Sequence, residues 1–269
     1  MAGSSEGVGG TPHAGRPVTA PWRLVDGPAG ALRVYSTTAA PGAAPCPVLV
    51  LCHELPRVTG GAADAGRAYP ALADRLSQES GFRVVTGMLR GAGGSDGNFS
   101  ATGWLEDLSF LMDEEVGPDG KVWMVGFGLG GAFALRLAAT DGRVRGVASL
   151  AGPADLAGWV ADTDAVLGRC RRTGVISSDG YPSDEAAWAA DLAGLRPLDA
   201  AGHLDDRPLL VVHGADDNEV PTAAARALAD AASPNGPVDL RIVPGAGHWL
   251  RADPRVVATL IGWLERQRA

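Results

Sequence analysis

Short apolar runs recur along this sequence, separated by longer segments that mix apolar and polar residues. Six runs consist mainly of apolar residues and are bounded by Gly, Pro or polar positions, which is typical of strands buried on both faces of a sheet. They occupy residues 48–52, 82–89, 122–125, 144–150, 208–212 and 238–243. Residues 22–26 and 31–36, joined by a Gly-Pro-Ala-Gly turn, predict an additional hairpin at a sheet edge.

The segments between these runs predict helices, which we expect at residues 67–79, 101–116, 132–139, 222–232 and 254–266. In the second helix the apolar positions recur at helical spacing and form one buried face, while the acidic positions are expected to face water. The apolar face comprises Trp104, Leu105, Leu108, Leu111 and Met112, and the acidic residues are Glu106, Asp107, Asp113, Glu114 and Glu115. Strands that alternate with helices in this way predict an α/β fold with a mostly parallel sheet covered on both faces. Ligands of such sheets bind at the carboxyl ends of the strands.

One stretch breaks this alternation. Residues 155–206 separate two predicted strands and are too long for a plain connection. We expect them to form a small helical cap, inserted into a single α/β domain that spans residues 21–269. Residues 1–20 are rich in Gly, Ser, Pro and Thr and have no apolar core, so they predict a disordered tail, not a signal peptide or a membrane span.

The net charge and the cysteines of the chain disfavour several kinds of partner and site. The 269 residues carry a formal net charge of −8, with a pI near 5.1, which disfavours nucleic acid and anionic membranes as partners. The three cysteines, Cys46, Cys52 and Cys170, have no CxxC spacing and give neither a disulfide framework nor a zinc site. We therefore expect a cytoplasmic protein without a metal or other cofactor, whose partner is a small-molecule ligand or substrate. The sequence leaves the oligomeric state open.

A Gly-rich turn joins the strand at 122–125 to the helix at 132–139. Its sequence, at 126–131, is Gly-Phe-Gly-Leu-Gly-Gly. This is the framework of a nucleophile elbow, G-x-S-x-G, in which a strained turn at the top of a parallel sheet presents the middle residue to substrate. Here the middle residue is Gly128, so the turn is predicted but its hydroxyl or thiol is absent. Glycine also adopts the positive φ of such a turn without the roughly 1–3 kcal/mol that it costs other residues.

Five fragments stand in the order found in α/β-hydrolases, namely VLVLCHE, RGAGGSDG, GFGLGG, HGADDNEVP and GAGHW. On these motifs the chain resembles that superfamily from residue 48 to residue 264, with the order nucleophile, acid, histidine. By this resemblance His248 is the catalytic base, and Asp217 is the acid that orients its imidazole. Asp216 is the rival acid, although a place in the turn is favoured for it. His213, at a strand end, is expected to serve packing and hydrogen bonding.

The same resemblance implies an oxyanion hole. Its donors would be the backbone N–H groups of Leu129 and Leu55, with Glu54 as the neighbouring candidate for the latter. In many esterases and lipases Gly follows the histidine that stands here as His53, so Glu54 is a departure. It is similar to the dienelactone-hydrolase branch, in which a Glu of this loop interacts with a cysteine nucleophile. Glu54 either faces the site, where it would repel an oxyanion, or is a solvated loop residue.

Gly128 excludes a covalent acyl-enzyme at that position. One interpretation is a protein related to ester, lactone and amide hydrolases, in which His248 and Asp217 form a dyad that deprotonates water or substrate directly. The alternative is a catalytically inactive small-molecule-binding or regulatory protein. A pure interaction module would not need the dyad.

We expect a partly apolar pocket beneath the cap, lined by tryptophans for which core packing is the alternative role. These residues are Trp159, Trp188 and Trp249. Other side chains with nucleophilic atoms lie at strand or turn ends, where packing and turn chemistry explain them better than a replacement of the missing nucleophile. They are Cys52, Ser95 and Ser149.

Overall fold

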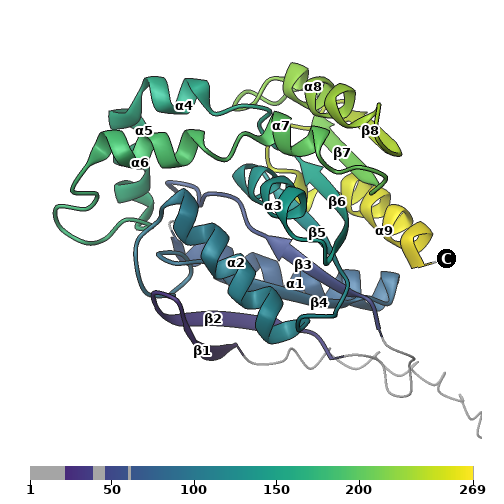
Figure 1. The fold of residues 1–269 in the computed structure, drawn as a ribbon, viewed down its shortest axis with the longest axis horizontal. Coiled ribbons are helices and arrows are strands. Elements are labelled where there is room, and N and C mark those ends of the chain that lie inside the picture. Colours follow the sequence, from purple (N-terminus) through teal and green to yellow (C-terminus); the bar gives the residue numbers. More distant parts are fainter. Residues whose placement is uncertain (1–21, 39–45, 60–61, 269) are drawn as a thin grey trace, which may run out of the picture.

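A computed structural model describes residues 22–38, 46–59 and 62–268 (Figure 1). The predicted tail, residues 1–20, lies outside the described residues. Within them, the chain forms a central sheet with helices on both faces, and a group of further helices lies beyond one end of the sheet.

The sheet of the described chain has eight strands in the order β1-β2-β4-β3-β5-β6-β7-β8. The first two strands form a hairpin, β2 pairs antiparallel with β4, and all other neighbouring strands are parallel. The strands are β1 (Arg23–Gly27), β2 (Gly30–Ser36), β3 (Val48–Cys52), β4 (Arg83–Met88), β5 (Val122–Phe127), β6 (Val144–Leu150), β7 (Leu209–Gly214) and β8 (Val238–Val243). The predicted α/β fold, with a mostly parallel sheet and an antiparallel hairpin at one edge, is confirmed.

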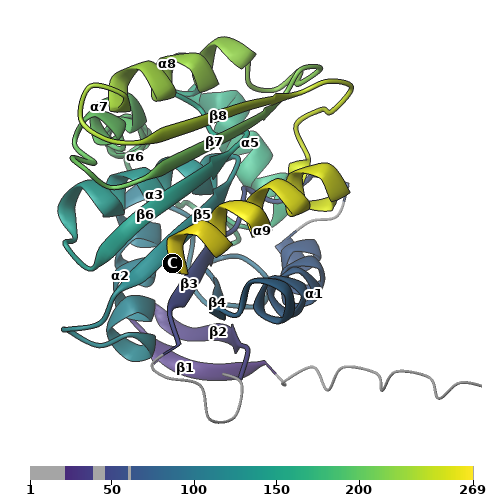
Figure 2. The same ribbon diagram turned by 90° about the vertical axis from the view of Figure 1, so that its right-hand side faces the viewer.

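Helices cover the two faces of this sheet (Figure 2). One face carries α1 (Ala62–Ser80) and α9 (Pro254–Arg268), the latter preceded by the short helix η1 (Leu250–Ala252). The other face carries α2 (Ala101–Glu115), α3 (Leu129–Thr140) and α8 (Thr222–Ala232). Apolar side chains form a separate core on each face. Among the described residues, no helix combines the length and the apolar character needed to cross a membrane.

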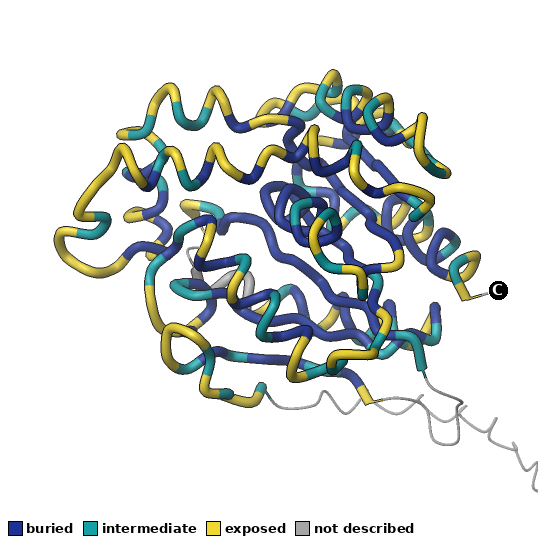
Figure 3. The backbone as a smooth tube through the Cα atoms, in the orientation of Figure 1, coloured by how far each residue is buried: buried dark blue, intermediate teal, exposed yellow. Residues whose placement is uncertain are grey.

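The continuous apolar runs become the central strands. Every residue of β3 and β7 is buried, as expected for strands that have helices on both sides (Figure 3). Because β3 to β8 run parallel, their carboxyl ends meet at one edge of the sheet. The loops that follow β3, β5, β7 and β8 therefore converge there.

The segment between β6 and β7 forms α4 (Ala157–Ala161), α5 (Thr163–Thr173), α6 (Glu185–Ala193) and α7 (Pro197–Gly202). The first three lie together, beyond the edge of the sheet where the strands end (Figure 1). Trp188 of α6 anchors this group, because its Nε1–H donates to the carbonyl oxygen of Phe99 at 3.0 Å and the two rings meet edge to face. In contrast, α7 packs against α3 and α8, so the end of the predicted cap segment lies on the body of the fold.

The expectation that the acidic residues of α2 all face water was wrong for two of them. Asp107 is fully buried, and its carboxylate accepts hydrogen bonds from the backbone N–H of Arg90 at 2.7 Å and from the Arg90 guanidinium. The side chain of Glu115 is also largely buried, and it forms ion pairs with Arg23 and Arg83. In both cases arginines on β-strands or at their ends supply the charge that makes a buried carboxylate tolerable.

Replacing Asp107 by Ala should lower the free energy of unfolding by roughly 3–5 kcal/mol, because it leaves the partly buried Arg90 guanidinium without its principal partner. Glu106 offers a matched control, since it contacts the same guanidinium at 2.9 Å but is about half exposed. Its replacement by Ala should cost less than about 1 kcal/mol. Urea denaturation of both variants measures the difference, and equal losses would contradict the assignment of Asp107 as the structural partner.

Candidate active site

The turn between β5 and α3 places Gly128 at the carboxyl edge of the sheet. Gly128 has φ of 50° and ψ of −126°, a conformation that residues with a Cβ adopt only under strain. Its N–H donates to the carbonyl oxygen of Leu150 at 2.8 Å, and its carbonyl oxygen accepts from Gly131 at 2.9 Å. At Gly130 a Cβ would lie 2.4 Å from the carbonyl oxygen of Cys52, so this glycine allows α3 to approach β3 closely. The sequence G-x-G-x-G thus forms a sharp strand-to-helix turn.

His248 and Asp217 form a hydrogen-bonded pair from two different loops. His248 lies after β8, and its Nδ1 is 2.9 Å from Oδ2 of Asp217, in the loop after β7. The other carboxylate oxygen accepts the backbone N–H groups of Glu219 and Val220, each at 2.9 Å. Since a carboxylate accepts, Nδ1 carries the hydrogen in the neutral ring and Nε2 presents a lone pair.

This lone pair is directed at the turn. His248 Nε2 lies 3.2 Å from the point where a Cβ on Gly128 would stand, and Cβ of Glu54 lies 3.2 Å from the same point. The loops after β3, β5, β7 and β8 therefore meet at one place. Asp216, the rival acid, is exposed and uses its N–H in a turn bond to the carbonyl oxygen of Ala246.

His213 supports the loop that carries Asp217. It is fully buried at the end of β7, and its Nε2 lies 2.9 Å from the carbonyl oxygen of Val220 and 3.1 Å from Oδ2 of Asp217. An Nε2–H in this position donates to the carbonyl oxygen of Val220, and Oδ2 of Asp217 lies close to the same nitrogen. His213 thus holds the strand end, the turn and the acid in fixed relative positions.

The loop after β3 brings Glu54 and Leu55 to the same edge. Glu54 is buried and forms an ion pair with Arg251, so the alternative in which it is a solvated loop residue does not hold. Its backbone N–H donates to the hydroxyl of Tyr69 at 3.2 Å. Leu129, the first residue of α3, has a backbone N–H without an acceptor inside the helix.

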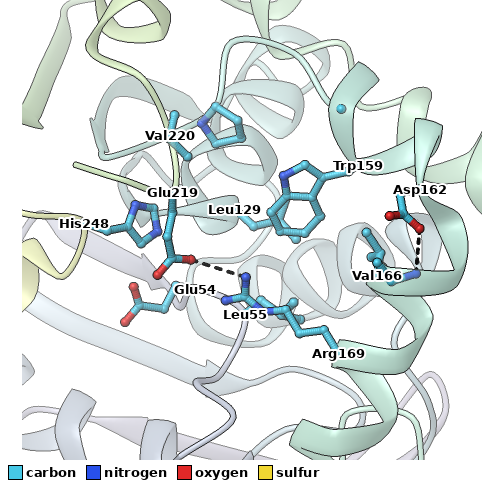
Figure 4. Close-up of a pocket in the computed structure, with 13 residues that line it drawn as sticks. Glu54, Leu55, Leu129, Trp159, Asp162, Val166, Arg169, Glu219, Val220 and His248 are labelled. Carbon is cyan, nitrogen blue, oxygen red and sulfur yellow. Dashed lines mark hydrogen bonds and ion pairs between the residues drawn. The ribbon is translucent and has the colours of Figure 1, made fainter.

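A cavity of about 380 Å³ opens in front of these groups (Figure 4). Leu55, Leu129, Trp159, Val166 and Val220 supply apolar surface, and Glu54, Asp162, Arg169, Glu219 and His248 supply polar groups. Helices α4 and α5 form the wall that faces the dyad. The volume is at the small end of the roughly 300–1,000 Å³ typical of ligand sites.

The three tryptophans expected at the cavity differ in their placement. Trp159 of α4 lines it, whereas Trp188 and Trp249 are not among the lining residues. Trp188 is buried between α6 and α2, where it anchors α6. Trp249 stacks against the Arg57 guanidinium at 3.8 Å, with its ring edge to face against His248. Packing on neighbouring elements, the alternative role, accounts for both placements.

None of the other candidate nucleophiles reaches the cavity in the described chain. Burial raises the pKa of the Cys52 thiol, which keeps it protonated and inert. The Ser95 hydroxyl donates to the carbonyl oxygen of Met88, and Ser149 is buried between glycines of the elbow and of the loop after β6. Nor does the described part of the chain contain a cluster of three His, Cys, Asp or Glu residues with the spacing of a metal site.

Three residues of this region were not predicted as site residues. Arg169 and Glu219 face each other in the cavity, with Nη1 of Arg169 3.3 Å from a carboxylate oxygen of Glu219 (Figure 4). Arg251, which does not line the cavity, forms an ion pair with Glu54. These pairs join residues far apart in sequence, and only the position of Arg251 just after His248 offered a local signal.

His53, immediately before Glu54, is a fully buried neutral histidine. Its Nδ1–H donates to the carbonyl oxygen of Glu54 at 2.9 Å, and Nε2 accepts the N–H of Leu89 at 3.1 Å. In a protonated ring Nε2 would also carry a hydrogen, so two N–H donors would face each other and the hydrogen bond from Leu89 would be lost. Burial, with a smaller contribution from the charge of Arg251, lowers the pKa of His53 to about 3.

Acid should therefore destabilise the fold through His53. Its pKa is lower in the folded than in the unfolded state, so the unfolded chain takes up the proton first, and stability falls as the pH drops from about 6.5 towards 3. Between pH 7 and pH 5 this group should lower the free energy of unfolding by about 2 kcal/mol. His53→Gln keeps an acceptor for the N–H of Leu89 but cannot take up the proton. Its free energy of unfolding, measured by urea denaturation, should therefore fall less between pH 7 and pH 5. The same pH dependence in both proteins would contradict the assignment.

Comparisons with known proteins agree with this architecture. A sequence profile of the alpha/beta hydrolase family matches residues 49–260. A search of curated protein sequences gives no match. Solved structures are similar over nearly the whole chain. One is Est1E from Butyrivibrio proteoclasticus with bound ferulic acid, at 19% identity and a TM-score of 0.68, covering 91% of this chain and 97% of that chain.

Two further structures give the same result. A thermophilic esterase from Thermogutta terrifontis is 21% identical with a TM-score of 0.64, covering 93% of this chain and 100% of its own. Alpha/beta hydrolase domain-containing protein 10 from mouse is 16% identical with a TM-score of 0.65, covering 93% and 98%. At these identities the structures show a common fold, and the profile match over most of the sequence shows the family. The chain belongs to the alpha/beta hydrolase family.

Proposed function

We propose that this protein is a slow hydrolase of small esters or lactones, in which the dyad of His248 and Asp217 activates water without an acyl-enzyme. The observation that carries this proposal is the 3.2 Å between Nε2 of His248 and the Cβ position of Gly128. An oriented base thus faces the place where a nucleophile would stand, and the place is open because glycine has no side chain.

In the proposed reaction the water occupies the space that a serine hydroxyl would fill. Nε2 of His248 accepts a proton from this water as the oxygen adds to the ester carbonyl, and Asp217 stabilises the imidazolium that forms. Leu55 and Leu129 line the cavity, and their backbone N–H groups would donate to the developing oxyanion. When the tetrahedral intermediate collapses, the C–O bond breaks and the alkoxide leaves with the proton from His248.

Glu54 sets the electrostatic condition for this chemistry. A carboxylate beside a developing oxyanion opposes it, but the ion pair with Arg251 offsets the negative charge of Glu54. The N–H of Glu54 is taken by Tyr69, which leaves Leu55 as the donor from this loop.

The expected rate is low. Serine hydrolases that lose their nucleophile retain roughly 10³- to 10⁴-fold acceleration over water from the oxyanion hole and from binding. The dyad of this protein is already oriented by hydrogen bonds, so activity in that range is what the geometry supports.

A second candidate function is non-catalytic binding of a small molecule. It is favoured by the combination of Gly128, which removes covalent chemistry, with Glu54, whose buried carboxylate lies beside the turn. Such a protein would show ligand-dependent thermal stabilisation without turnover.

The function of His248 can be tested directly. Hydrolysis of short-chain 4-nitrophenyl esters should fall by at least about 100-fold in His248→Ala, because general base catalysis typically contributes that much or more. His203 provides the control, since it is an exposed histidine that does not line the cavity, and His203→Ala should keep the parent rate. A rate in His248→Ala equal to that of the parent protein would eliminate the dyad mechanism, and no turnover in the parent protein would leave ligand binding as the function.

Gly128→Ser should restore the nucleophile. A serine Cβ would lie 3.2 Å from both His248 Nε2 and Glu54 Cβ, so these side chains must yield by a few tenths of an ångström. We expect at least a 100-fold gain in esterase activity, below the roughly 10⁶-fold that an optimised triad loses with its serine, and labelling by a fluorophosphonate. Gly128→Ala is the control, since it imposes the same backbone strain without the hydroxyl. A folded Gly128→Ser variant with neither gain nor labelling would refute the reading of this turn as an elbow.

A further inference from the structure

Arg169 projects from α5 into the cavity, where its guanidinium lies next to Glu219 (Figure 4). Of the thirteen described residues that line the cavity, it alone carries a permanent positive charge. Its guanidinium lies over the ring of Trp159 at 5.9 Å, which gives the cation an aromatic support. The side chain is about 28% exposed, so it is neither a core residue nor a free surface residue.

The hydrogen-bonding capacity of this arginine is only partly used. Nη1 donates to Glu219 at 3.3 Å, a long contact for a charge-assisted bond, and the buried Nε has no acceptor in the described part of the chain. A guanidinium offers five N–H donors in a planar fork that matches a carboxylate bidentately. The guanidinium therefore has donors that no acceptor of the described chain satisfies, and a buried donor without an acceptor is costly.

The acidic groups of the cavity are each already occupied. Glu54 pairs with Arg251, and Asp162 is an exposed residue whose carboxylate caps α5 by accepting the N–H of Ala165 at 3.0 Å. Glu219 contacts Arg169 itself, and its backbone N–H is held by Asp217. The spare side-chain hydrogen-bond donors of the cavity therefore lie with Arg169.

We propose that Arg169 is a specificity-determining residue that binds a carboxylate of the ligand, and that Glu219 takes this position when the cavity is empty. The substrate class is then an acyl compound with a carboxylate at one end and the scissile ester at the other, such as a half-ester of a small dicarboxylic acid. The Trp159 ring and the apolar lining accommodate the hydrocarbon between the two ends. The hydrolysis of that ligand rests on the proposed function, whereas its binding does not.

Binding can be measured separately from turnover. Glutaranilic acid is an anilide analogue of a glutarate half-ester and resists hydrolysis, and its primary amide is the neutral counterpart. Isothermal titration calorimetry should show that the parent protein binds the acid at least about tenfold more tightly than the amide, since hydrogen bonds to charged groups have that strength. In Arg169→Met this preference should disappear, with the affinity for the amide unchanged.

The chain offers matched variants. Arg171 lies on the same helix outside the cavity, so Arg171→Met makes the same change of charge and should keep the preference for the acid. Glu219→Gln removes the competing carboxylate and should raise the affinity for the acid. Arg169→Lys keeps the charge but not the planar fork, and should retain only part of the preference.

Several outcomes would overturn the proposal. They are equal affinities of the parent protein for acid and amide, no binding of either, or an unchanged preference in Arg169→Met. A loss in Arg171→Met as large as in Arg169→Met would also do so, because it would show a general effect of charge. Turnover of 4-nitrophenyl hydrogen glutarate against its methyl ester tests the proposed function at the same site. Binding that depends on Arg169 without any turnover would refute the hydrolase proposal and leave the carboxylate site standing.

Discussion

The carboxylate of Asp217 is the group on which the geometry of the site depends. It is fully buried and accepts hydrogen bonds from two backbone N–H groups of its own turn and from Nδ1 of His248. It also lies within hydrogen-bond distance of His213. A buried carboxylate is tolerable only when its oxygens are satisfied. The conformation of the loop after β7, the orientation of the imidazole and the direction of Nε2 are therefore coupled. This network needs no nucleophile, which explains how an oriented base exists beside Gly128.

The cavity has two chemically different sides. The side formed by the loops of the sheet contains the dyad, together with Leu55 and Leu129, whose backbone N–H groups we propose as the oxyanion donors. The side formed by α4 and α5 contains Arg169 over the ring of Trp159, and this arginine is the group that we propose binds a carboxylate of the ligand. The two sides are joined through Glu219, whose side chain contacts Arg169 and whose backbone N–H donates to Asp217.

The sequence predicted the fold and several of the residues that meet at the carboxyl edge of the sheet. The physical reasons for this also explain why the placements of other residues were not predicted. Apolar runs such as 48–52 and 208–212 have no polar face, so burial on both sides was their only stable arrangement. Asp107 was assigned to water because helical spacing describes one helix alone, and the charge that neutralises it, Arg90, lies on another element. The pairing of Arg169 with Glu219 was invisible for the same reason, since it joins residues fifty positions apart. Trp188 and Trp249 were placed at the ligand by residue type, which does not distinguish a ring that binds from one that packs.

The helices α4, α5 and α6 differ in the number of contacts that attach them to the rest of the fold. Trp188 fixes α6 to the body of the fold through a hydrogen bond and a ring contact, and α5 buries three residues. Helix α4 buries none of its residues, although it supplies Trp159 to the cavity wall. Local opening costs least where the fewest apolar contacts are broken. Of the two helices that wall the cavity, α4 is therefore the one that we expect to move away from the site at the lower cost.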